Sequence, residues 1–171
     1  RHMYDYVETN ANNDTYYSFT WGPAFFIVLD CGEDKRDNHP NYFGLLDAEP
    51  WRRAEAEWLR EQLESDAYKQ AAFRIIVMHI PMWANGKWIS FATHEVRNLF
   101  LPLLQEAKPD VVVCGHTHNF GILPPDEAHA FPIVIGGGKD PDAQKEVMLP
   151  TVMQLSVTKK KLDLNVYNYH G

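Results

Sequence analysis

The chain has 171 residues, enough to bury the core of one ordinary domain. A hydrophobic content of 45% with 13% aromatic residues excludes an intrinsically disordered chain. The formal net charge of -7 argues against a nucleic-acid partner, because such binding depends on a basic surface. No stretch approaches the roughly 20 consecutive apolar residues of a membrane span, so we expect no membrane partner.

The first half of the chain contains a predicted β-hairpin, a loop and a helix. The runs 15–20 and 25–31 are rich in aromatic and β-branched residues and are separated by Trp21-Gly22-Pro23, which predicts two strands and a turn. Residues 32–50 are polar and rich in turn-forming types, which indicates a long surface loop. Apolar residues then recur at helical spacing over 51–68, directly after Pro50.

The second half continues as alternating strands and helices and ends in β-structure. Short apolar runs at 73–78, 111–114 and 131–135 predict buried strands, and 94–107 predicts a helix that Pro102 kinks. The alternating runs 151–158 and 161–169 predict an antiparallel hairpin. We therefore predict an α/β fold with a mixed sheet, as a single domain over residues 1–171 with no linker.

Three histidines directly follow two of these strands. His79 comes after strand 73–78, and His116 and His118 come after strand 111–114 and Gly115, which we expect to supply the sharp turn. A helix joins the two strands, so they form a βαβ unit whose carboxyl ends open onto the ligand-binding edge of the sheet. A lone histidine after a strand is usually structural, but three at one edge predict a metal site suited to zinc, iron or manganese.

The sequences around these histidines resemble the last two motifs of the calcineurin-like metallophosphoesterases. The resemblance rests on the runs His79-Ile80-Pro81 and Gly115-His116-Thr117-His118-Asn119, and the intervening Trp83 and Asn85 look closest to the purple acid phosphatase-like branch. It covers most of residues 15–170. It implies part of an αββα sandwich with antiparallel C-terminal strands.

The resemblance also implies a chemistry. His79 and His116 would ligate one metal ion and His118 a second one. The two ions, Mn, Fe or Zn, would activate water for in-line attack on a small phosphorylated substrate, a monoester or a diester. The implied activity is that of a phosphatase or phosphodiesterase.

The motifs that normally come first in this family are not found. No Gly-Asp pair precedes His79, and no Gly-Asn-His run occurs anywhere. In the family those motifs bring the bridging aspartates, an asparagine ligand and the histidine that protonates the leaving group. We therefore expect a partial domain that holds at most one ion well and is nearly inactive alone. We also expect it to self-associate, or to pair with a chain that supplies the missing half.

Two alternatives stay open. A catalytically dead metal-binding or structural module could keep the fold without the aspartates. A complete mononuclear zinc hydrolase would need all three histidines within about 2.1 Å of one ion. Asp30, at the end of the second predicted strand, could lie near the site, although a structural role is favoured. Cys31 and Cys114 are expected to be buried free thiols, which leaves the compartment undecided.

Overall fold

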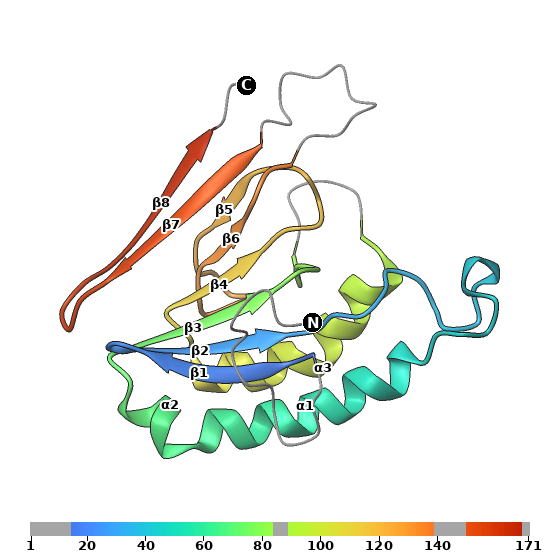
Figure 1. The fold of residues 1–171 in the computed structure, drawn as a ribbon, viewed down its shortest axis with the longest axis horizontal. Helices are drawn as coiled ribbons and strands as arrows, with labels where there is room; N and C mark the ends of the chain where they lie inside the picture. Colours follow the sequence, from blue (N-terminus) through green and yellow to red (C-terminus); the bar gives the residue numbers. More distant parts are fainter. Residues whose placement is uncertain (1–14, 84–88, 139–149, 169–171) are drawn as a thin grey trace, which may run out of the picture.

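The computed structural model describes residues 15–83, 89–138 and 150–168, and its centre is a six-stranded mixed sheet (Figure 1). The strand order is β1-β2-β3-β4-β6-β5, with β2, β3, β4 and β6 parallel and the two edge strands antiparallel. The mixed α/β fold predicted from the sequence is confirmed. The strands are β1 (Tyr17–Trp21), β2 (Ala24–Leu29), β3 (Phe73–Met78), β4 (Val111–Cys114), β5 (Gly121–Leu123) and β6 (Ile133–Ile135).

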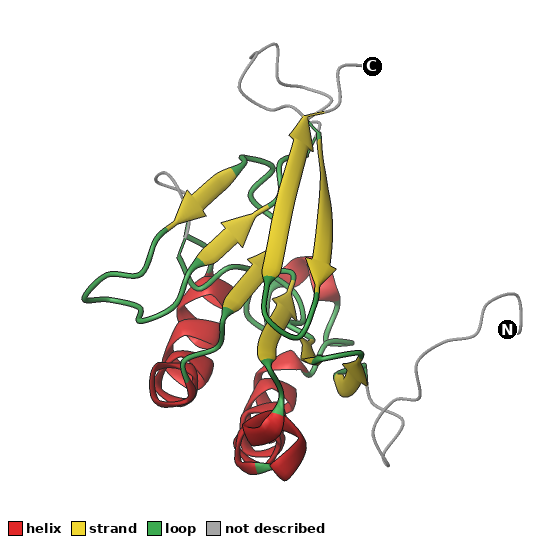
Figure 2. Ribbon diagram, turned by 90° about the vertical axis from the view of Figure 1, so that its left-hand side faces the viewer, coloured by secondary structure: helices red, strands yellow, loops and turns green. Residues whose placement is uncertain are grey.

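Helices cover one face of this sheet. The two long helices, α1 (Ala48–Glu64) and α3 (Phe91–Ala107), lie side by side below the sheet in Figure 1 and on one side of it in Figure 2. Successive side chains of a strand point to opposite faces of the sheet, so β3 contributes to the hydrophobic core on each face. Ile76 and Met78 belong to the core between the sheet and the helices, whereas Ile75 and Val77 belong to the cluster on the opposite face. Neither long helix combines the length and the apolar character needed to cross a bilayer, within the described residues.

A hairpin of β7 (Thr151–Val157) and β8 (Leu162–Asn168) covers the other face. Its inward side chains, among them Leu155 and Leu164, pack with Ile75 and the other residues of the second cluster. Its outer face leaves Val152 60% exposed and Tyr167 53% exposed. The described residues therefore form three layers, helices, main sheet and hairpin, with helices on one outer side.

The predicted helix 51–68 is in fact two helices with an earlier start. The helix breaks at Ser65, whose backbone is extended and whose hydroxyl accepts the N–H of Tyr68 to start α2 (Asp66–Gln70). The first helix begins at Ala48 because the carboxylate of Asp37 accepts the N–H groups of Ala48 and Glu49. Asp37 lies 11 residues upstream of Ala48, so the periodicity of residues 51–68 gives no sign of this cap.

Other boundaries differ by a few residues. The second long helix starts at Phe91 rather than at 94, with the Ser90 hydroxyl as its cap, and it continues past Pro102 to Ala107. The short β5 was not predicted, and part of the expected loop 32–50 forms a 3-10 turn, Pro40–Tyr42. Cys31 and Cys114 are buried free thiols, as predicted. Burial raises the pKa of both, that of Cys31 to about 12.

Candidate metal centre at the carboxyl edge of the sheet

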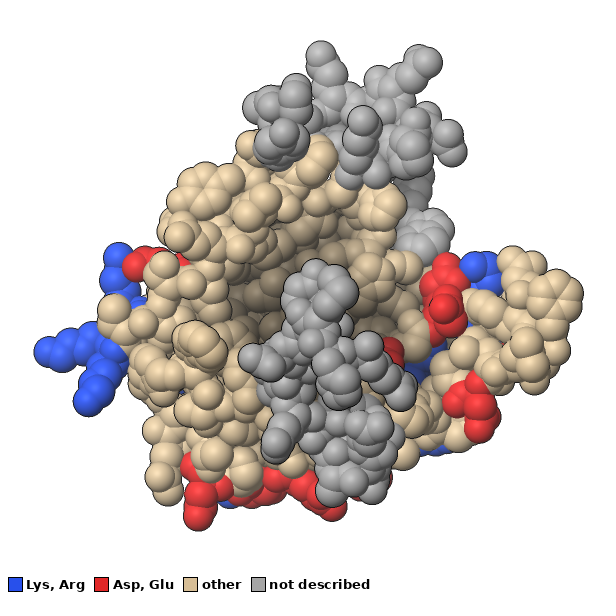
Figure 3. Space-filling model, in the orientation of Figure 1, with Lys and Arg blue, Asp and Glu red and all other residues tan. Residues whose placement is uncertain are grey.

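His79 and His116 meet where β3 and β4 end. The parallel pairing of these strands continues past their ends, since the N–H of Gly115 donates to the carbonyl of His79 at 3.0 Å. Nδ1 of His116 lies 3.3 Å from Nε2 of His79, and the two rings are nearly perpendicular at 79°. Figure 3 shows a hollow in the face of the molecule where the central strands of Figure 1 end. The structure thus brings together two of the three histidines at the predicted edge.

The separation of the two nitrogens fits a shared ion. Two imidazole nitrogens, each about 2.0–2.1 Å from one tetrahedral zinc ion, lie roughly 3.3–3.4 Å apart. The observed 3.3 Å equals that value and also allows an N–H···N hydrogen bond between the rings. The separation therefore suits either a hydrogen bond between the rings or a common ion.

Burial and the neighbouring imidazole favour the neutral form of His116. Desolvation by burial lowers the pKa of His116, and the neighbouring His79 lowers it further. Asp34 acts in the opposite direction and raises it. A neutral imidazole has a lone pair available for a cation near neutral pH, which is the state that a metal ligand needs.

The turn after β4 is made by the histidines and not by the glycine. His116 has φ 67° and His118 has φ 58°, both in the left-handed region, whereas the positive-φ glycines of the described residues are Gly22, Gly32 and Gly44. The prediction that Gly115 supplies the turn is therefore wrong. A left-handed non-glycine residue costs about 1–3 kcal/mol, and such strain gathers at functional sites.

This strain predicts an unusual order of variant stabilities. At position 118 we expect His118→Gly to be more stable than His118→Ala by about 1 kcal/mol, because only glycine adopts the observed φ of 58° without penalty. At His94, inside α3, the order should reverse by about the same amount, because glycine weakens a helix interior. Urea unfolding of the four metal-free variants measures both differences. The same order at both positions would contradict a left-handed residue 118.

His118 lies near the pair but is not grouped with it as a third ligand. Its carbonyl accepts the N–H of Gly138 at 3.0 Å, and a Cβ on Gly138 would lie 3.3 Å from the His118 ring. It is close enough to His116 to lower the pKa of that residue. In the described parts of the chain, no group of three or more His, Cys, Asp or Glu is arranged to hold a metal ion. The geometry therefore gives no support to a mononuclear three-histidine site, and the metal roles of the three histidines remain predictions.

A charged cluster beside the histidines was missed in the sequence. The Asp34 carboxylate accepts from Lys35 Nζ at 2.7 Å and from the Tyr42 hydroxyl at 3.3 Å. The hydrogen bond from Lys35 is the main cause that lowers the pKa of Asp34. All three residues belong to the segment 32–50, whose length suggested a functional loop. Only the fold shows that this segment reaches His116.

Other candidates have structural roles. Asp30 accepts hydrogen bonds from the Gly32 N–H and the Thr15 hydroxyl, as favoured from the sequence. The run 37–39 is an exception to the missing motifs, since it has the spelling Asp-x-His of the family's first motif. Asp37 caps α1 and His39 caps the 3-10 turn, so both have structural roles here. His129 is buried, with Nδ1 2.9 Å from the Phe131 carbonyl.

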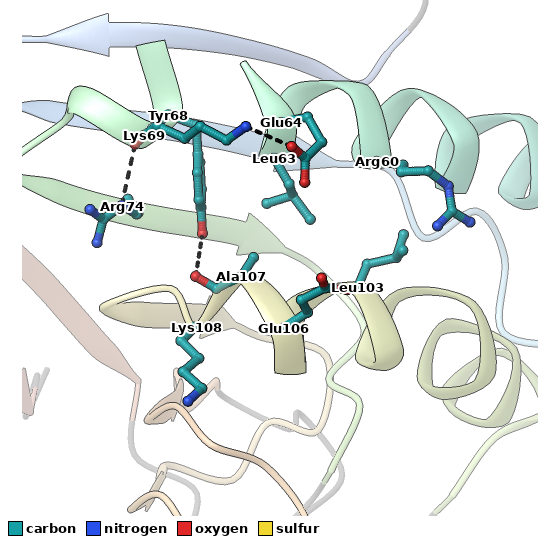
Figure 4. A pocket seen from close by; sticks show the side chains of 10 residues that line it. All are labelled: Arg60, Leu63, Glu64, Tyr68, Lys69, Arg74, Leu103, Glu106, Ala107 and Lys108. Atoms are coloured by element: carbon teal, nitrogen blue, oxygen red, sulfur yellow. Dashed lines mark hydrogen bonds and ion pairs between the residues drawn. The ribbon is translucent and has the colours of Figure 1, made fainter. Parts of the chain in front are cut away.

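A cavity of about 570 Å³ lies at the opposite, amino end of the strands (Figure 4). It is bordered by the last turns of α1, α2 and α3, and Arg74 lies near the start of β3. Polar groups at its wall already have partners, such as the Tyr68 hydroxyl on the Ala107 carbonyl and Lys69 on Glu64. It contains no histidine and is separate from the candidate metal centre.

The sequence and the fold are similar to those of known proteins. The family model described as calcineurin-like phosphoesterase matches residues 3–120. Purple acid phosphatase 21 of Arabidopsis thaliana is 23% identical over 144 residues, which covers 81% of this chain and 30% of the relative. The structure of the purple acid phosphatase PPD1 from yellow lupin (Lupinus luteus) seeds superposes with a TM-score of 0.61 at 15% identity, over 96% of this chain and 32% of that chain. The chain thus spans about a third of the length of these relatives, and the structural likeness concerns the fold alone.

Proposed function

This chain belongs to the calcineurin-like phosphoesterase family, and on that premise we propose that it takes part in metal-dependent hydrolysis of phosphate esters. His79 and His116 hold one ion, and His118 contributes to a second. The observation that carries the proposal is the 3.3 Å approach of two imidazole nitrogens at the ends of neighbouring parallel strands. That separation is what a shared tetrahedral ion requires.

The donor set determines the class of metal. Imidazole nitrogens suit zinc, iron and manganese better than calcium or magnesium, which favour oxygen ligands. When bound, two such ions neutralise the phosphate charge and activate water for in-line attack. The protein's part is to keep His79 and His116 oriented through the Gly115–His79 backbone hydrogen bond and to keep His116 neutral. A small phosphate ester is the proposed substrate.

The family chemistry also needs carboxylate ligands, which the described residues do not group with the histidines. We propose that the chain of 171 residues alone binds at most one ion well and turns over substrate near background. The bridging carboxylates then come from residues outside those described, or from a second chain. Association through the exposed outer face of β7–β8, which includes Val152 and Tyr167, would be one route to the latter.

Turnover tests this proposal. We expect the product of the whole gene to hydrolyse p-nitrophenyl phosphate or its bis-ester with Mn²⁺ or Zn²⁺ present, and the 171-residue chain to be near background. His116→Ala should reduce turnover to background, while His94→Ala on the exposed side of α3 should not change it. Turnover that survives both a chelator and His116→Ala would refute the proposal of metal-dependent hydrolysis. Brisk turnover by the 171-residue chain alone would refute the proposal that this chain is nearly inactive by itself.

The competing function is a catalytically dead metal-binding module of the same fold. It is favoured by one observation, the lack of a three-ligand group among the described residues. It predicts that the whole gene product binds metal through His79 and His116 yet hydrolyses neither ester. The same assay, run beside a measurement of bound metal, separates the two functions.

A further inference from the structure

A second cavity, of about 520 Å³, is lined by the segment that follows β2. This segment starts next to the histidine pair, since the N–H of Ile80, the residue after His79, donates to Cys31 Sγ at 3.3 Å. It is an open cavity between the loop 34–40 and the first residues of α3, and Asp34, which acts electrostatically on His116, forms part of its wall. Its lining combines an aromatic ring with several polar side chains. The residues around it are Asp34, Lys35, Arg36, Asn38, His39, Pro40, Ser90 and Phe91.

Contacts from both long helices hold this loop in place. The Arg52 side chain of α1 donates to the carbonyls of Cys31 and Glu33, just before the cavity residues. On the other side, the N–H of Ala92 in α3 donates to the carbonyl of Asp34. A wall fixed at several points offers its side chains to a ligand with little loss of conformational entropy.

The cations of the cavity are not equivalent. Lys35 is neutralised by the carboxylate of Asp34 at 2.7 Å. Arg36 instead places its guanidinium 4.2 Å from the centre of the Phe91 ring, and within the described residues this guanidinium makes no hydrogen bond or ion pair. Stacking on a ring leaves the N–H donors at the guanidinium edge available for a planar oxyanion.

Two further groups narrow the choice of ligand. His39 accepts the N–H of Asn41 on Nδ1, so its neutral ring carries the proton on Nε2 and offers a donor. The start of α3 has fewer N–H donors available for a ligand, since the N–H groups of Ala92 and Thr93 already donate to Asp34 and Ser90. The capacity for an anion therefore resides mainly in Arg36, on a protein whose net charge is -7.

We propose that this cavity receives the alcohol part of the substrate and that Arg36 binds an oxyanion on it, a carboxylate or a second phosphate-type group. The substrate class is then a phosphate ester of an anionic alcohol. This inference rests on the proposed function, because the alcohol is the group that leaves when the ester is cleaved at the neighbouring histidines. Arg36 is accordingly a specificity-determining residue.

Binding of leaving-alcohol analogues to the metal-free chain tests the inference. Three phenols share one ring and differ in one substituent: 4-hydroxybenzoate, 4-hydroxyphenylphosphonate and neutral 4-hydroxybenzamide. In NMR titrations we expect at least one anionic phenol to bind about fivefold tighter than the amide, a modest gain because Arg36 is solvent-exposed. Which anion binds tighter separates a carboxylate from a phosphate-type group. Equal binding of all three to the wild-type chain would overturn the inference.

Variants locate the effect. Arg36→Gln should remove the preference for the anion, and Arg36→Lys, which keeps the charge but loses the planar fork, should retain only part of it. Arg53→Gln, on the exposed side of α1, is the matched control and should leave it unchanged. Discrimination that persists in Arg36→Gln would contradict the assignment. Since neither metal nor turnover enters these titrations, their failure is distinct from a failure of the proposed function.

Discussion

Replacement of Arg52 by methionine is expected to lower the free energy of unfolding by about 2–4 kcal/mol, because the buried carbonyl of Cys31 and the partly buried carbonyl of Glu33 would lose their donors. Arg52 is 0% exposed, and its Nε donates to the Cys31 carbonyl at 2.7 Å while Nη2 donates to the Glu33 carbonyl. Methionine fills much of the same space but offers no donor. Leaving a buried polar group unsatisfied costs about 1–3 kcal/mol each.

The backbone around Arg52 cannot easily relax to recover these bonds. Gly32 has φ +59°, and a Cβ there would lie 2.9 Å from the Ala48 Cβ, so the loop already lies against α1 with no room for a side chain. A hydrogen bond at Asp30 also holds the loop against α1, since the Asp30 N–H donates to the buried Glu55 carboxylate at 2.7 Å. A loop held this closely has few alternative conformations in which the two carbonyls reach water.

Urea unfolding followed by circular dichroism measures the loss, and Arg53→Met is the matched control. Arg53 is the next residue of α1 and is exposed, so its replacement should change stability by less than about 0.5 kcal/mol. For a chain of this size the Arg52→Met loss corresponds to a fall in melting temperature of roughly 10 °C. Similar losses for the two variants would show that the buried guanidinium contributes nothing specific.

The central strands and the histidine pair could be predicted from the sequence because their signals are local. Residues 111–114 are all apolar, residues 73–78 are apolar except for Arg74, and the structure has strands with these bounds. A helix between two such runs implies parallel neighbours, and parallel neighbours bring the residues after them to one edge. His79 and His116 meet for that reason, with no information beyond chain order and periodicity.

The rest depends on contacts between distant residues or on backbone conformation. The start of α1 is set by Asp37, which lies upstream in a loop, and the left-handed turn belongs to His116 and His118, where a glycine was the natural expectation. The stacking of Arg36 on Phe91 joins residues 55 positions apart in the chain. Such long-range pairs have no periodic signature, so the cavity beside the metal centre becomes visible only in the fold.

Loss of either ring of the histidine pair should abolish tight metal binding. For His79→Ala and for His116→Ala we expect the affinity of the chain for Zn²⁺ to fall at least about 100-fold, because even the outer-shell partners of a metal site are worth about 10–100-fold. The 3.3 Å separation fits two nitrogens on the same ion, so in the proposed site either variant removes one of two imidazole ligands. Isothermal titration calorimetry against a competing chelator measures the change.

The double variant and His118 sharpen this test. If both rings hold one ion, His79→Ala/His116→Ala should bind little more weakly than either single variant, since partners in one site are strongly non-additive. Among the described residues no group of three ligands includes His118, and its implied role concerns the second ion. His118→Ala should therefore keep the first ion's affinity within about tenfold. A 100-fold loss in His118→Ala would instead place all three imidazoles on one ion, and equal affinity in all variants would remove the metal from this edge altogether.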